Sequence, residues 1–325
     1  MKVLVTGATG FLGQRTCEIL KKDFNHLSGL GRNEKKGREL LNKGVHFLKA
    51  DLTDYKKMES IVNGFDHIVH CGGLSSPWGK RKDFLEVNYK ASSNLAQLAQ
   101  KYKIKKFILI SSPSVYHSSK DLLDIKESDP ITTRPLNDYI ESKIKAEKSV
   151  LENFPNAIIL RPRAIIGPGD EAIFPRLIRA NNKGRLRTIG KGNNLTDLTY
   201  IDNAVEAIRC ALFSKDIANG QIFNISDGNP QKLWYIIDHV FNQLGLKRDP
   251  KLISYHFVYA YCFLSEIVHK FFLNNKEPVL TRYTCNLFAK SQTLNIKKAK
   301  KILGYQPKVN TMEGIEKFIN SYKKS

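Results

Sequence analysis

Short apolar runs alternate with longer amphipathic segments through the first half of this 325-residue chain, and that alternation restricts its possible folds most strongly. The apolar runs lie at 2–7, 26–31, 45–50, 67–72, 106–111 and 157–162. Helical patterns separate them, notably at 11–22, 55–63, 81–102 and 138–153. Regular alternation of strand and helix predicts a parallel sheet with helices on both faces. Because such crossovers are right-handed, we expect a doubly wound, Rossmann-type α/β fold.

The alternation weakens after residue 165. Gly and Pro cluster at 165–176 and 189–194, helical patterns follow at 203–213 and 231–245, and a further strand is indicated at 222–228. We expect residues 1–165 to form the Rossmann domain, with 189–228 contributing to it. Residues 166–325 should then form most of a smaller substrate lobe, interleaved with the first domain and placed over the carboxyl ends of the strands.

Composition argues against several classes of protein. The net charge of +21 is spread along the chain and is not gathered into a patch with interleaved aromatic residues, so we expect no nucleic-acid partner. The five cysteines lie far apart, without the spacing of a disulfide framework or a metal site, which fits a reducing cytoplasm. The chain begins directly with a strand-like segment, so we expect no signal peptide.

The segment VTGATGFLG places Gly7, Gly10 and Gly13 between the first strand and the first helix. Gly7 would permit the tight turn, Gly10 would let the backbone approach a pyrophosphate, and Gly13 would let the helix pack closely on the sheet. A glycine fingerprint at the first strand–helix junction of an alternating chain therefore predicts a dinucleotide cofactor.

The end of the second strand, GLGRNEKK, indicates which dinucleotide binds. A carboxylate here would bind the ribose 2′-hydroxyl of NAD(H), whereas an arginine accommodates the 2′-phosphate of NADP(H). Arg32 stands at this place, and the first acid is Glu34. We therefore expect NADP(H). NAD(H), with Arg32 pointing into solvent, is the alternative.

The segment DYIESK places Tyr139 and Lys143 four residues apart, on one face of a helix. A free tyrosine has a pKa of about 10, too high for an efficient base near neutral pH. A nearby cation favours the phenolate and lowers that pKa, and a lysine can also reach a nicotinamide ribose. We expect an acid–base unit for hydride transfer between a ketone and an alcohol, with a chance surface pair as the alternative.

A serine cluster, ILISSPSVYH, follows the fifth strand, at the same edge of the sheet as the glycine loop. A hydroxyl from this cluster would hold the substrate oxygen from the side opposite the tyrosine. The residues alone leave Ser111, Ser112 and Ser114 as candidates.

Together these motifs resemble the extended branch of the short-chain dehydrogenase/reductase superfamily, which has the spacing T-G-x-x-G-x-x-G and a Ser–Tyr–Lys set. The resemblance implies that Ser112 is the catalytic serine and that Tyr116 is not the catalytic phenol. It also implies cofactor contacts at Gly7, Thr9, Gly10, Phe11, Leu12, Arg32, Asp51, Leu52, Cys71, Gly72, Gly73, Asn88, Ser111, Tyr139, Lys143, Pro162, Arg163 and Ala164. For residues 162–164 the implied contact is from the backbone to the nicotinamide amide.

Further stretches resemble the 3β-hydroxysteroid dehydrogenase-like group. They are SSPWGK (75–80), SSPSVYH, LRPRAIIGPGD, TYIDN and the late segment 277–307. They are most similar to sterol-4α-carboxylate 3-dehydrogenases and to bacterial 2-alkyl-3-oxoalkanoate reductases, over nearly the whole chain. The resemblance implies a 3-oxo or 3-hydroxy group β to a carboxylate on a bulky apolar body, with Ser75, Ser114 and Tyr200 near the substrate.

Residues 252–272 are strongly apolar and aromatic, but they are interrupted by His256, Ser265, Glu266, His269 and Lys270. A membrane span needs about 20 predominantly apolar residues with few charges, so we expect no spanning helix. An interfacial amphipathic helix, a lid over an apolar substrate pocket and a buried core helix are the three alternatives. Lysines at 247, 251 and 276 flank the segment, which favours peripheral contact with an anionic membrane.

The expected function is NADP(H)-dependent interconversion of a 3-oxo and a 3-hydroxy group on a long-chain or sterol-like acid, without a metal. Two alternatives remain. One is a nucleotide-sugar epimerase or dehydratase, for which Arg176, Arg179, Arg185 and Arg187 could hold phosphates. The other is a non-catalytic dinucleotide-binding regulator. The resemblance also implies a homodimer formed through the helices at 81–102 and 138–153.

Overall fold

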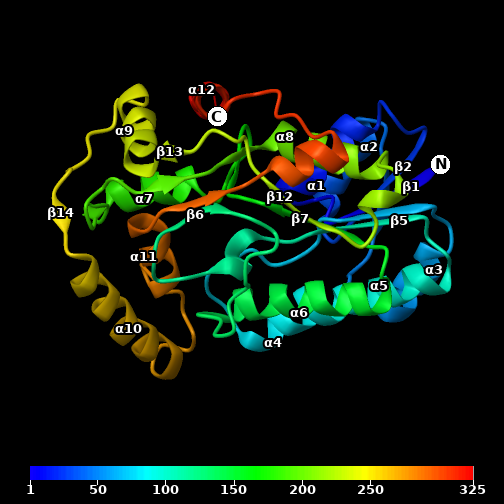
Figure 1. Cartoon of the computed structure of the whole chain (residues 1–325), viewed down its shortest axis with the longest axis horizontal. Helices are drawn as coiled ribbons and strands as arrows, with labels where there is room; N and C mark the ends of the chain where they lie inside the picture. The colour runs from blue at the N-terminus through cyan, green and yellow to red at the C-terminus, as the bar shows by residue number, and fades with distance from the viewer. Residues whose placement is uncertain (325) are drawn as a thin grey trace.

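The computed structural model describes residues 1–324 and is built around a parallel sheet of seven strands, in the order β12-β7-β5-β4-β1-β2-β3 (Figure 1). The strands are β1 (Lys2–Thr6), β2 (His26–Gly31), β3 (His46–Lys49), β4 (His67–His70), β5 (Lys106–Ile110), β7 (Ile158–Pro162) and β12 (Ile222–Ile225). The strand order reverses between β1 and β4, the point at which such sheets bind ligands. The predicted doubly wound α/β fold is confirmed.

Helices cover both faces of the central sheet (Figure 1). One layer is formed by α1 (Phe11–Leu20), α2 (Glu34–Asn42) and α8 (Ile201–Leu212), and the other by α3 (Tyr55–Val62), α5 (Ala91–Lys101) and α6 (Asp138–Asn153). Successive strand residues point to opposite faces, so Val3 and Val5 join the core under α1 and α8, whereas Leu4 joins the core under α3 and α5. Burial on both faces explains why the strands are continuous apolar runs.

The predicted helix at 81–102 is divided into three parts. It consists of α4 (Arg81–Phe84), a π-helical segment η1 (Leu85–Lys90) and α5. The π-helical segment carries Asn88, whose side chain accepts a hydrogen bond from the Leu74 backbone N–H at 2.7 Å and donates one to the Leu74 carbonyl at 3.0 Å. Such widened turns occur frequently at functional sites, and here the turn directs an amide onto the loop after β4.

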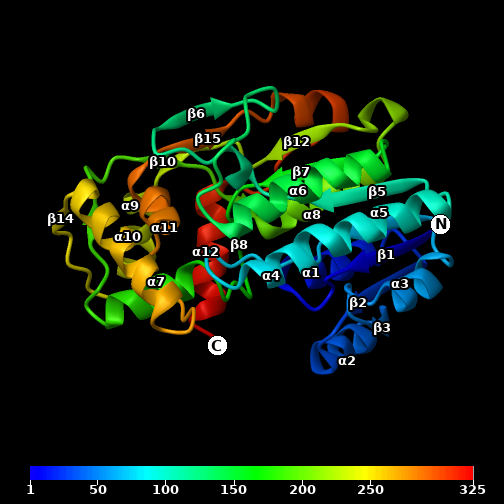
Figure 2. The same cartoon turned by 90° about the horizontal axis from the view of Figure 1, so that it is seen from below.

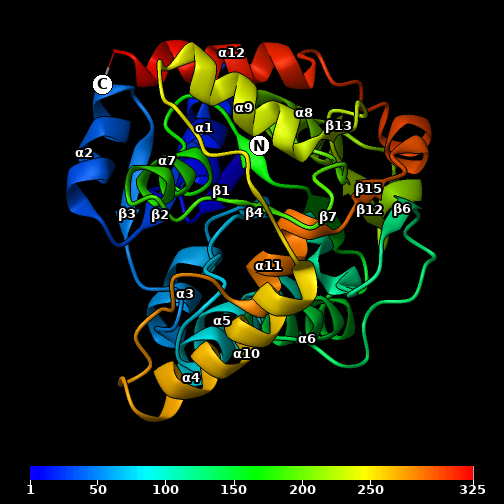
Figure 3. The same cartoon turned by 90° about the vertical axis from the view of Figure 1, so that its left-hand side faces the viewer.

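A smaller lobe lies at the carboxyl ends of the strands (Figures 2 and 3). Its sheet has the order β13-β10-β15-β6, and β8 pairs with β11 while β9 pairs with β14. Its strands are β6 (Leu122–Ile125), β8 (Ile165–Ile166), β9 (Thr188–Ile189), β10 (Leu195–Thr196), β11 (Thr199–Tyr200), β13 (Gln231–Lys232), β14 (Leu252–Ile253) and β15 (Gln292–Leu294), and its helices are α7 (Phe174–Asn182), α9 (Leu233–Gln243), α10 (Tyr255–Phe271), α11 (Arg282–Ala289) and α12 (Thr311–Tyr322).

The two lobes are interleaved along the chain. β12 belongs to the central sheet and α8 packs on it, although both follow β9, β10 and β11 in sequence. Later, the short helix η4 (Ala299–Leu303) packs with Leu294 and Tyr305 into the core that lies under α1 and α8. The chain therefore crosses between the lobes several times, which fixes the small lobe over the edge of the sheet. The short helices η2 (Pro113–Tyr116) and η3 (Asp216–Ala218) complete the elements.

Most of the apolar and aromatic segment 252–272 forms α10, which lies on the outside of the small lobe against α11 (Figure 3). Val258 and Cys262 are its buried residues, and many of its large apolar side chains are exposed. It is therefore not the buried core helix that was one of the three alternatives. Within residues 1–324, no helix combines the length and the apolar character that crossing a membrane requires.

Candidate active site

The glycine loop forms the turn between β1 and α1. Gly7 has φ +67°, in the left-handed region that favours glycine. A Cβ on Gly13 would lie 2.2 Å from the Gly7 carbonyl oxygen, so Gly13 is required for the approach of helix to loop. A Cβ on Gly10 would meet only that same oxygen, at 3.3 Å. A Cβ is therefore less restricted at position 10 than at position 13, and its absence keeps open the space at the N-terminus of α1, where a pyrophosphate fits.

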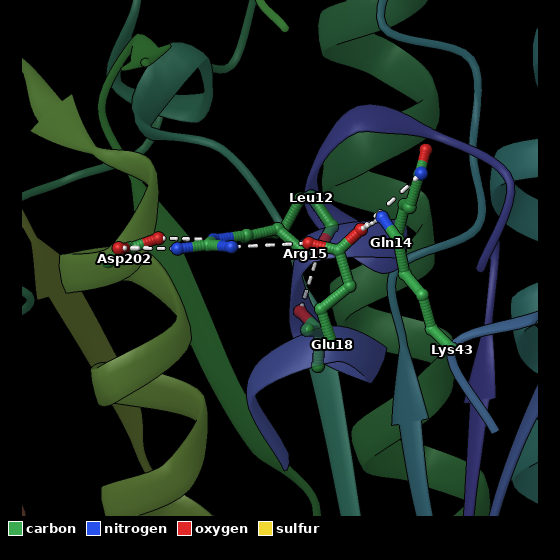
Figure 4. A network of polar contacts seen from close by, with 7 residues as sticks. Leu12, Gln14, Arg15, Glu18, Lys43 and Asp202 are labelled. Carbon is green, nitrogen blue, oxygen red and sulfur yellow. Dashed lines mark hydrogen bonds and ion pairs between the residues drawn. The ribbon is translucent and has the colours of Figure 1, made fainter. Parts of the chain in front are cut away.

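An ion pair holds α1 against α8 (Figure 4). Arg15 Nε lies 2.6 Å from Asp202 Oδ1 and Arg15 NH2 lies 2.9 Å from Asp202 Oδ2, while Arg15 NH1 contacts Glu18 at 3.2 Å. Asp202 belongs to the TYIDN segment singled out in the sequence. Its carboxylate therefore anchors the helix whose N-terminus faces the cofactor site. Phe11 and Leu12, at the start of α1, are half-buried.

The segment after β4 passes between the glycine loop and α6. A Cβ on Gly72 would lie 2.3 Å from the Leu52 side chain, and one on Gly73 would lie 3.0 Å from Asn88 Oδ1 and 3.6 Å from Lys143 Nζ. Cys71, just before, is half-buried, and burial raises the pKa of its thiol to about 12, so it stays protonated. The structure therefore brings the predicted cofactor residues of β4 together with those of α6.

Tyr139 and Lys143 lie one turn apart on α6, which begins after the N-cap Asn137. Both side chains are buried, with 8% of each residue exposed. The Tyr139 ring packs with Phe84 and Ile140, against the partly buried Leu74, Leu136 and Tyr283. Lys143 Nζ donates a hydrogen bond to the Ile110 carbonyl at 3.0 Å, at the end of β5. This is not a chance pair on a surface helix.

Burial dominates the protonation of both groups. It raises the pKa of Tyr139 above its usual value, while contacts with Ser112 and Ser114 and the charge of Arg163 lower it. Burial lowers the pKa of Lys143 to about 8, and the charge of Glu147 opposes this shift. We expected Lys143 to lower the pKa of Tyr139, and here the structure differs. Lys143 is directed to the end of β5, so the cation that acts on the phenol is Arg163.

The serine cluster lies beside Tyr139. Ser112 caps η2 and accepts a hydrogen bond from the Ser114 backbone N–H at 3.2 Å. Within residues 1–324, the buried Oγ atoms of Ser111 and Ser114 make no hydrogen bond. Ser112 and Ser114 both influence the phenol, so these two stay candidates for the hydroxyl that holds the substrate oxygen. Tyr116 lies elsewhere, with its hydroxyl 3.2 Å from Asn224 Oδ1 in the core.

A buried polar chain that sequence reasoning missed connects β1 to the catalytic helix. His70 lies 2.7 Å from Thr6 Oγ1 and 2.8 Å from Ser92 Oγ. Ser92 donates to the Asn88 carbonyl at 2.6 Å, and Asn88 Nδ2 donates to Ser142 Oγ at 2.9 Å. Because Ser92 already donates, it accepts from His70 Nε2, so Nδ1 accepts from Thr6. Burial lowers the pKa of His70 to about 3, and the ring stays neutral.

The adenosine side of the site contains Arg32 and Asp51. Arg32 follows β2 and lies 3.4 Å from Asp51 Oδ2, with 68% of its side chain exposed. Asp51 also accepts hydrogen bonds from the Thr53 N–H and hydroxyl, at 2.9 and 2.8 Å, and these contacts hold its pKa below the usual value. Thr9 packs under the end of β2, since a Cβ on Gly31 would lie 2.7 Å from its hydroxyl.

The other predicted residues lie either at the end of β7, where the cofactor contacts were expected, or away from the side chains around Tyr139. Pro162 ends β7, and Arg163 and Ala164 follow it at the same edge of the sheet, with Ala164 at φ +40°. A non-glycine residue in the left-handed region is strained, and such residues cluster at functional sites. Ser75 is exposed on the loop after β4. Tyr200 is buried against Gly167 and Gly314, outside the side-chain cluster around Tyr139.

Comparison with known proteins agrees with this geometry. Residues 3–226 match the NAD dependent epimerase/dehydratase family. A 2-alkyl-3-oxoalkanoate reductase of Stenotrophomonas maltophilia is 29% identical, covering 98% of each chain. A decarboxylating sterol-4-alpha-carboxylate 3-dehydrogenase of Mus musculus is also 29% identical, covering 99% of this chain and 91% of the relative.

A solved structure with a similar fold is UDP-glucuronic acid 4-epimerase from Bacillus cereus in complex with UDP-glucuronic acid and NAD. It is 22% identical, with a TM-score of 0.78 over 100% of this chain and 99% of that chain. The glycine loop, the buried Tyr139–Lys143 pair and the family match over more than half of the sequence lead to one conclusion. The chain belongs to the NAD-dependent epimerase/dehydratase family of extended short-chain dehydrogenases/reductases and is an oxidoreductase that acts on CH–OH and C=O groups.

Proposed function

We propose that the protein interconverts the 3-oxo and 3-hydroxy groups of long-chain or sterol-like acids, with NADP(H) as its cofactor. The observation that carries the proposal is the apolar packing around the Tyr139 ring, formed by Phe84, Ile140, Leu74, Leu136 and Tyr283. An aliphatic substrate fills such a site, whereas the hydroxyl groups of a sugar would be buried there without partners. The names of the reductase and dehydrogenase relatives support the same substrate class.

Each side chain of the site then has a separate task. The bound cofactor supplies a hydride to the carbonyl carbon in reduction and accepts one in oxidation. Tyr139 donates its phenolic proton to the carbonyl oxygen in reduction and takes it back in oxidation. Because burial keeps the phenol protonated near pH 7, the site is suited to reduction. Ser112 or Ser114 orients the oxygen, and Lys143 lies on the side of Gly73, where a nicotinamide ribose would bind.

The preference for NADP(H) rests on the charges after β2. Glu34, the first acid after this strand, forms an ion pair with Lys49 at the protein surface. Arg32 is exposed and has only a loose ion pair with Asp51, at 3.4 Å. A 2′-phosphate would find this guanidinium available, with Lys36 nearby on α2.

The epimerase alternative has support from the fold, since similar structures bind sugar nucleotides. The arginines that could hold phosphates give it less support. Arg176 pairs with Glu277 at 3.2 Å, and Arg187 pairs with Asp249 at 3.3 Å. The non-catalytic alternative is weakened by the intact Tyr139–Lys143 pair.

The test combines turnover with cofactor exchange. Purified protein should reduce 3-oxo acids with added NADPH faster than with NADH. Tyr139→Phe should lower kcat by about 100- to 10,000-fold, the usual contribution of a general acid, while the Kd for NADPH stays within about threefold. Protein that copurifies with tightly bound NAD and converts UDP-sugars, but not 3-oxo acids, would show that the alternative is correct.

A further inference from the structure

Arg163 is a buried cation that forms no ion pair with a carboxylate within residues 1–324. It follows β7, where its backbone N–H donates to the Ile225 carbonyl at 3.0 Å and its carbonyl accepts from Thr199 Oγ1 at 2.6 Å. Only 8% of the residue is exposed. Within residues 1–324, its Nε has no hydrogen-bond partner and its guanidinium forms no ion pair with a carboxylate. A buried charge is costly unless it is paired, so the absence of a partner requires an explanation.

The neighbouring arginine shows the contrast. Arg161, two residues earlier on β7, is equally buried but lies 2.9 and 2.5 Å from the two carboxylate oxygens of Glu147. The guanidinium of Arg161 is therefore neutralised by a carboxylate of the protein itself. Arg163 comes just after the strand, at the edge of the sheet that carries the active site, and its charge acts on Tyr139. Its missing partner is therefore expected to be a ligand.

The pocket beside Arg163 is polar and positively charged. It is lined by His117, Asn286, Lys290 and Gln292 together with Arg163. Burial and the charge of Arg163 lower the pKa of His117 to about 4, so this ring is neutral at pH 7. Burial lowers the pKa of Arg163 and the charge of Asp197 opposes this shift, but the two side chains form no ion pair within residues 1–324. The Asp197 carboxylate instead accepts a hydrogen bond from the Leu294 N–H at 2.6 Å. The pocket therefore has no anion of its own next to the guanidinium.

Arg163 is also close to the catalytic phenol. Its charge acts on Tyr139, and Tyr139 and Tyr283 act on it in turn. The Tyr283 ring lies 5.6 Å from the His117 ring, so α11 connects the two sides of the pocket. A ligand whose oxygen meets Tyr139 would have a neighbouring anionic group within reach of this guanidinium.

We infer that Arg163 binds the carboxylate of the substrate and makes the enzyme select 3-oxo and 3-hydroxy acids over their neutral esters. The inference rests on the proposed function, because it needs the substrate carbonyl at Tyr139. In such an acid one carbon separates the carboxylate from the carbonyl or carbinol carbon. The two groups can therefore reach Tyr139 and Arg163 at the same time. The fork of an arginine matches the two carboxylate oxygens.

The test compares an acid with its ester. 3-Hydroxyoctanoate and its methyl ester are titrated by calorimetry into protein saturated with NADPH, where both components are reduced and nothing reacts. We expect Arg163→Gln to weaken binding of the acid relative to the ester by about 10- to 100-fold, the range for hydrogen bonds to charged groups. Arg163→Lys should recover part of the loss. The control Arg209→Gln, on a partly exposed arginine of α8 that pairs with Asp23, should change neither ligand's binding.

Three outcomes separate the possibilities. An unchanged ratio of acid to ester affinity in Arg163→Gln would overturn the inference, and so would a parallel loss of NADPH affinity, which would make Arg163 a cofactor ligand. The wild-type protein could also bind the acid through Arg163 but oxidise neither compound with NADP⁺. That result would support the carboxylate site and refute the proposed function. Circular dichroism spectra of each variant check that it is folded.

A second inference rests on a separate observation, the outer face of α10. Phe257, Tyr261, Leu264, Val268 and Phe271 follow each other at spacings of four and three residues, which places them on one side of the helix. Phe257 is 71% exposed and Phe271 is 73% exposed. The opposite side is buried through Val258 and Cys262. α10 thus presents a continuous apolar face to the outside of the protein.

The surroundings of this face are basic. Lys247, Lys251, Lys270 and Lys276 are exposed before, on and after α10. The acid of the helix, Glu266, is bound by Arg282 at 2.7 Å. A second copy of the chain would bring another net charge of +21 to the contact, whereas an anionic bilayer offers opposite charge and an apolar interior.

The apolar face ends next to the active site. In the turn after α10, the Asn275 carbonyl accepts a hydrogen bond from Trp78 Nε1 at 2.9 Å, on the loop that also carries Ser75. The charge of Lys270 acts on Asp138, the residue before the catalytic tyrosine. We propose that α10 lies in the surface of an anionic membrane, so that an apolar substrate can pass from the lipid to the site.

Vesicle cosedimentation tests this proposal. The full chain should bind vesicles that contain phosphatidylglycerol, less at high salt, and should not bind vesicles of phosphatidylcholine alone. The triple variant Phe257→Ser, Leu264→Ser and Phe271→Ser should lose binding, whereas the control Ile217→Ser, on a similarly exposed apolar residue elsewhere, should not. Undiminished binding of the triple variant would refute the proposal. So would a wild-type dimer that this variant converts to a monomer, because the face would then belong to a second copy.

Discussion

The buried pair of Glu147 and Arg161 allows stability and catalysis to be tested with one substitution. Their side chains are 5% and 3% exposed and are joined by two parallel contacts, of 2.9 and 2.5 Å. Arg161 also lies over the Tyr116 ring, 4.7 Å from its centroid. Glu147 stands on α6 one turn beyond Lys143, and its charge acts on that lysine.

Glu147→Gln keeps the shape of the side chain but leaves the guanidinium without a negative partner. Breaking one half of a buried pair costs about 3–5 kcal/mol, and we expect the lower end, since the glutamine still offers one acceptor. The double variant Glu147→Leu, Arg161→Met removes both charges, and should recover to within about 1–2 kcal/mol of wild type, because apolar replacements of buried pairs are often neutral. Urea unfolding followed by circular dichroism measures both changes.

The same substitution should change the pH dependence of activity. The charge of Glu147 raises the pKa of Lys143, which burial lowers to about 8. Removing that charge lowers this pKa further, so the lysine loses its proton at a lower pH. The alkaline limb of the kcat/KM profile should therefore move to lower pH in Glu147→Gln.

Glu152→Gln is the matched control. This glutamate is on the same helix but is exposed, with a weak contact of 3.9 Å to Lys148. Exposed pairs contribute about 0–1 kcal/mol, so neither the urea midpoint nor the pH profile should move. If Glu147→Gln unfolds at the wild-type urea concentration, the argument about the buried charge is wrong. If its pH profile stays in place, Glu147 does not control Lys143.

Four further substitutions test other parts of the site. Gly13→Ala should unfold or distort the loop, since its Cβ would lie 2.2 Å from the Gly7 oxygen, whereas Gly10→Ala should keep the wild-type melting temperature and bind NADPH more weakly in fluorescence titrations. Arg32→Glu should raise the KM for NADPH by about 10- to 100-fold, as expected for a lost charged hydrogen bond, and an unchanged KM would show that Arg32 does not read the phosphate. Asn88→Ala leaves both Leu74 backbone groups without this partner, so it should cost about 2 kcal/mol or more of unfolding free energy and lower kcat, and a stable, fully active variant would argue against the polar chain.

The central sheet could be predicted because its signal is local. Most strands of the sheet are buried on both faces, so they appear in the sequence as short, largely apolar runs, whereas the edge strand β3 has no buried residue. The helix predicted at 138–153 is α6 with the same bounds, since Asn137 caps its start by accepting a hydrogen bond from the Ile140 N–H. The strand β6 was missed, because only its last residue, Ile125, is buried and its pairing partner β15 lies far along the chain.

The chemistry of the site was less predictable, because it depends on directions of side chains that spacing does not give. Spacing placed Lys143 one turn from Tyr139, but it could not show that the ammonium group turns to the Ile110 carbonyl. It likewise could not show that Arg163, expected to contribute through its backbone, has an unpartnered Nε and a charge that acts on the phenol. No sequence pattern marked His70 as a site residue. Its ring contacts Thr6 on β1 and Ser92 on α5, and such contacts between distant parts of the chain cannot be seen in the sequence.

The two buried cations near Tyr139 suggest how substrate and proton transfer are connected. Lys143 lies on the side of the glycine loop, and Arg163 lies on the side of the small lobe. In the ligand-free protein the charge of Arg163 lowers the pKa of the phenol. A carboxylate bound at Arg163 would neutralise that charge and raise this pKa, so the phenol would hold its proton more firmly until the carbonyl oxygen accepts it. A neutral ester cannot have this effect, so binding of the acid should shift the ultraviolet titration of Tyr139 to higher pH, and binding of the ester should leave it unchanged.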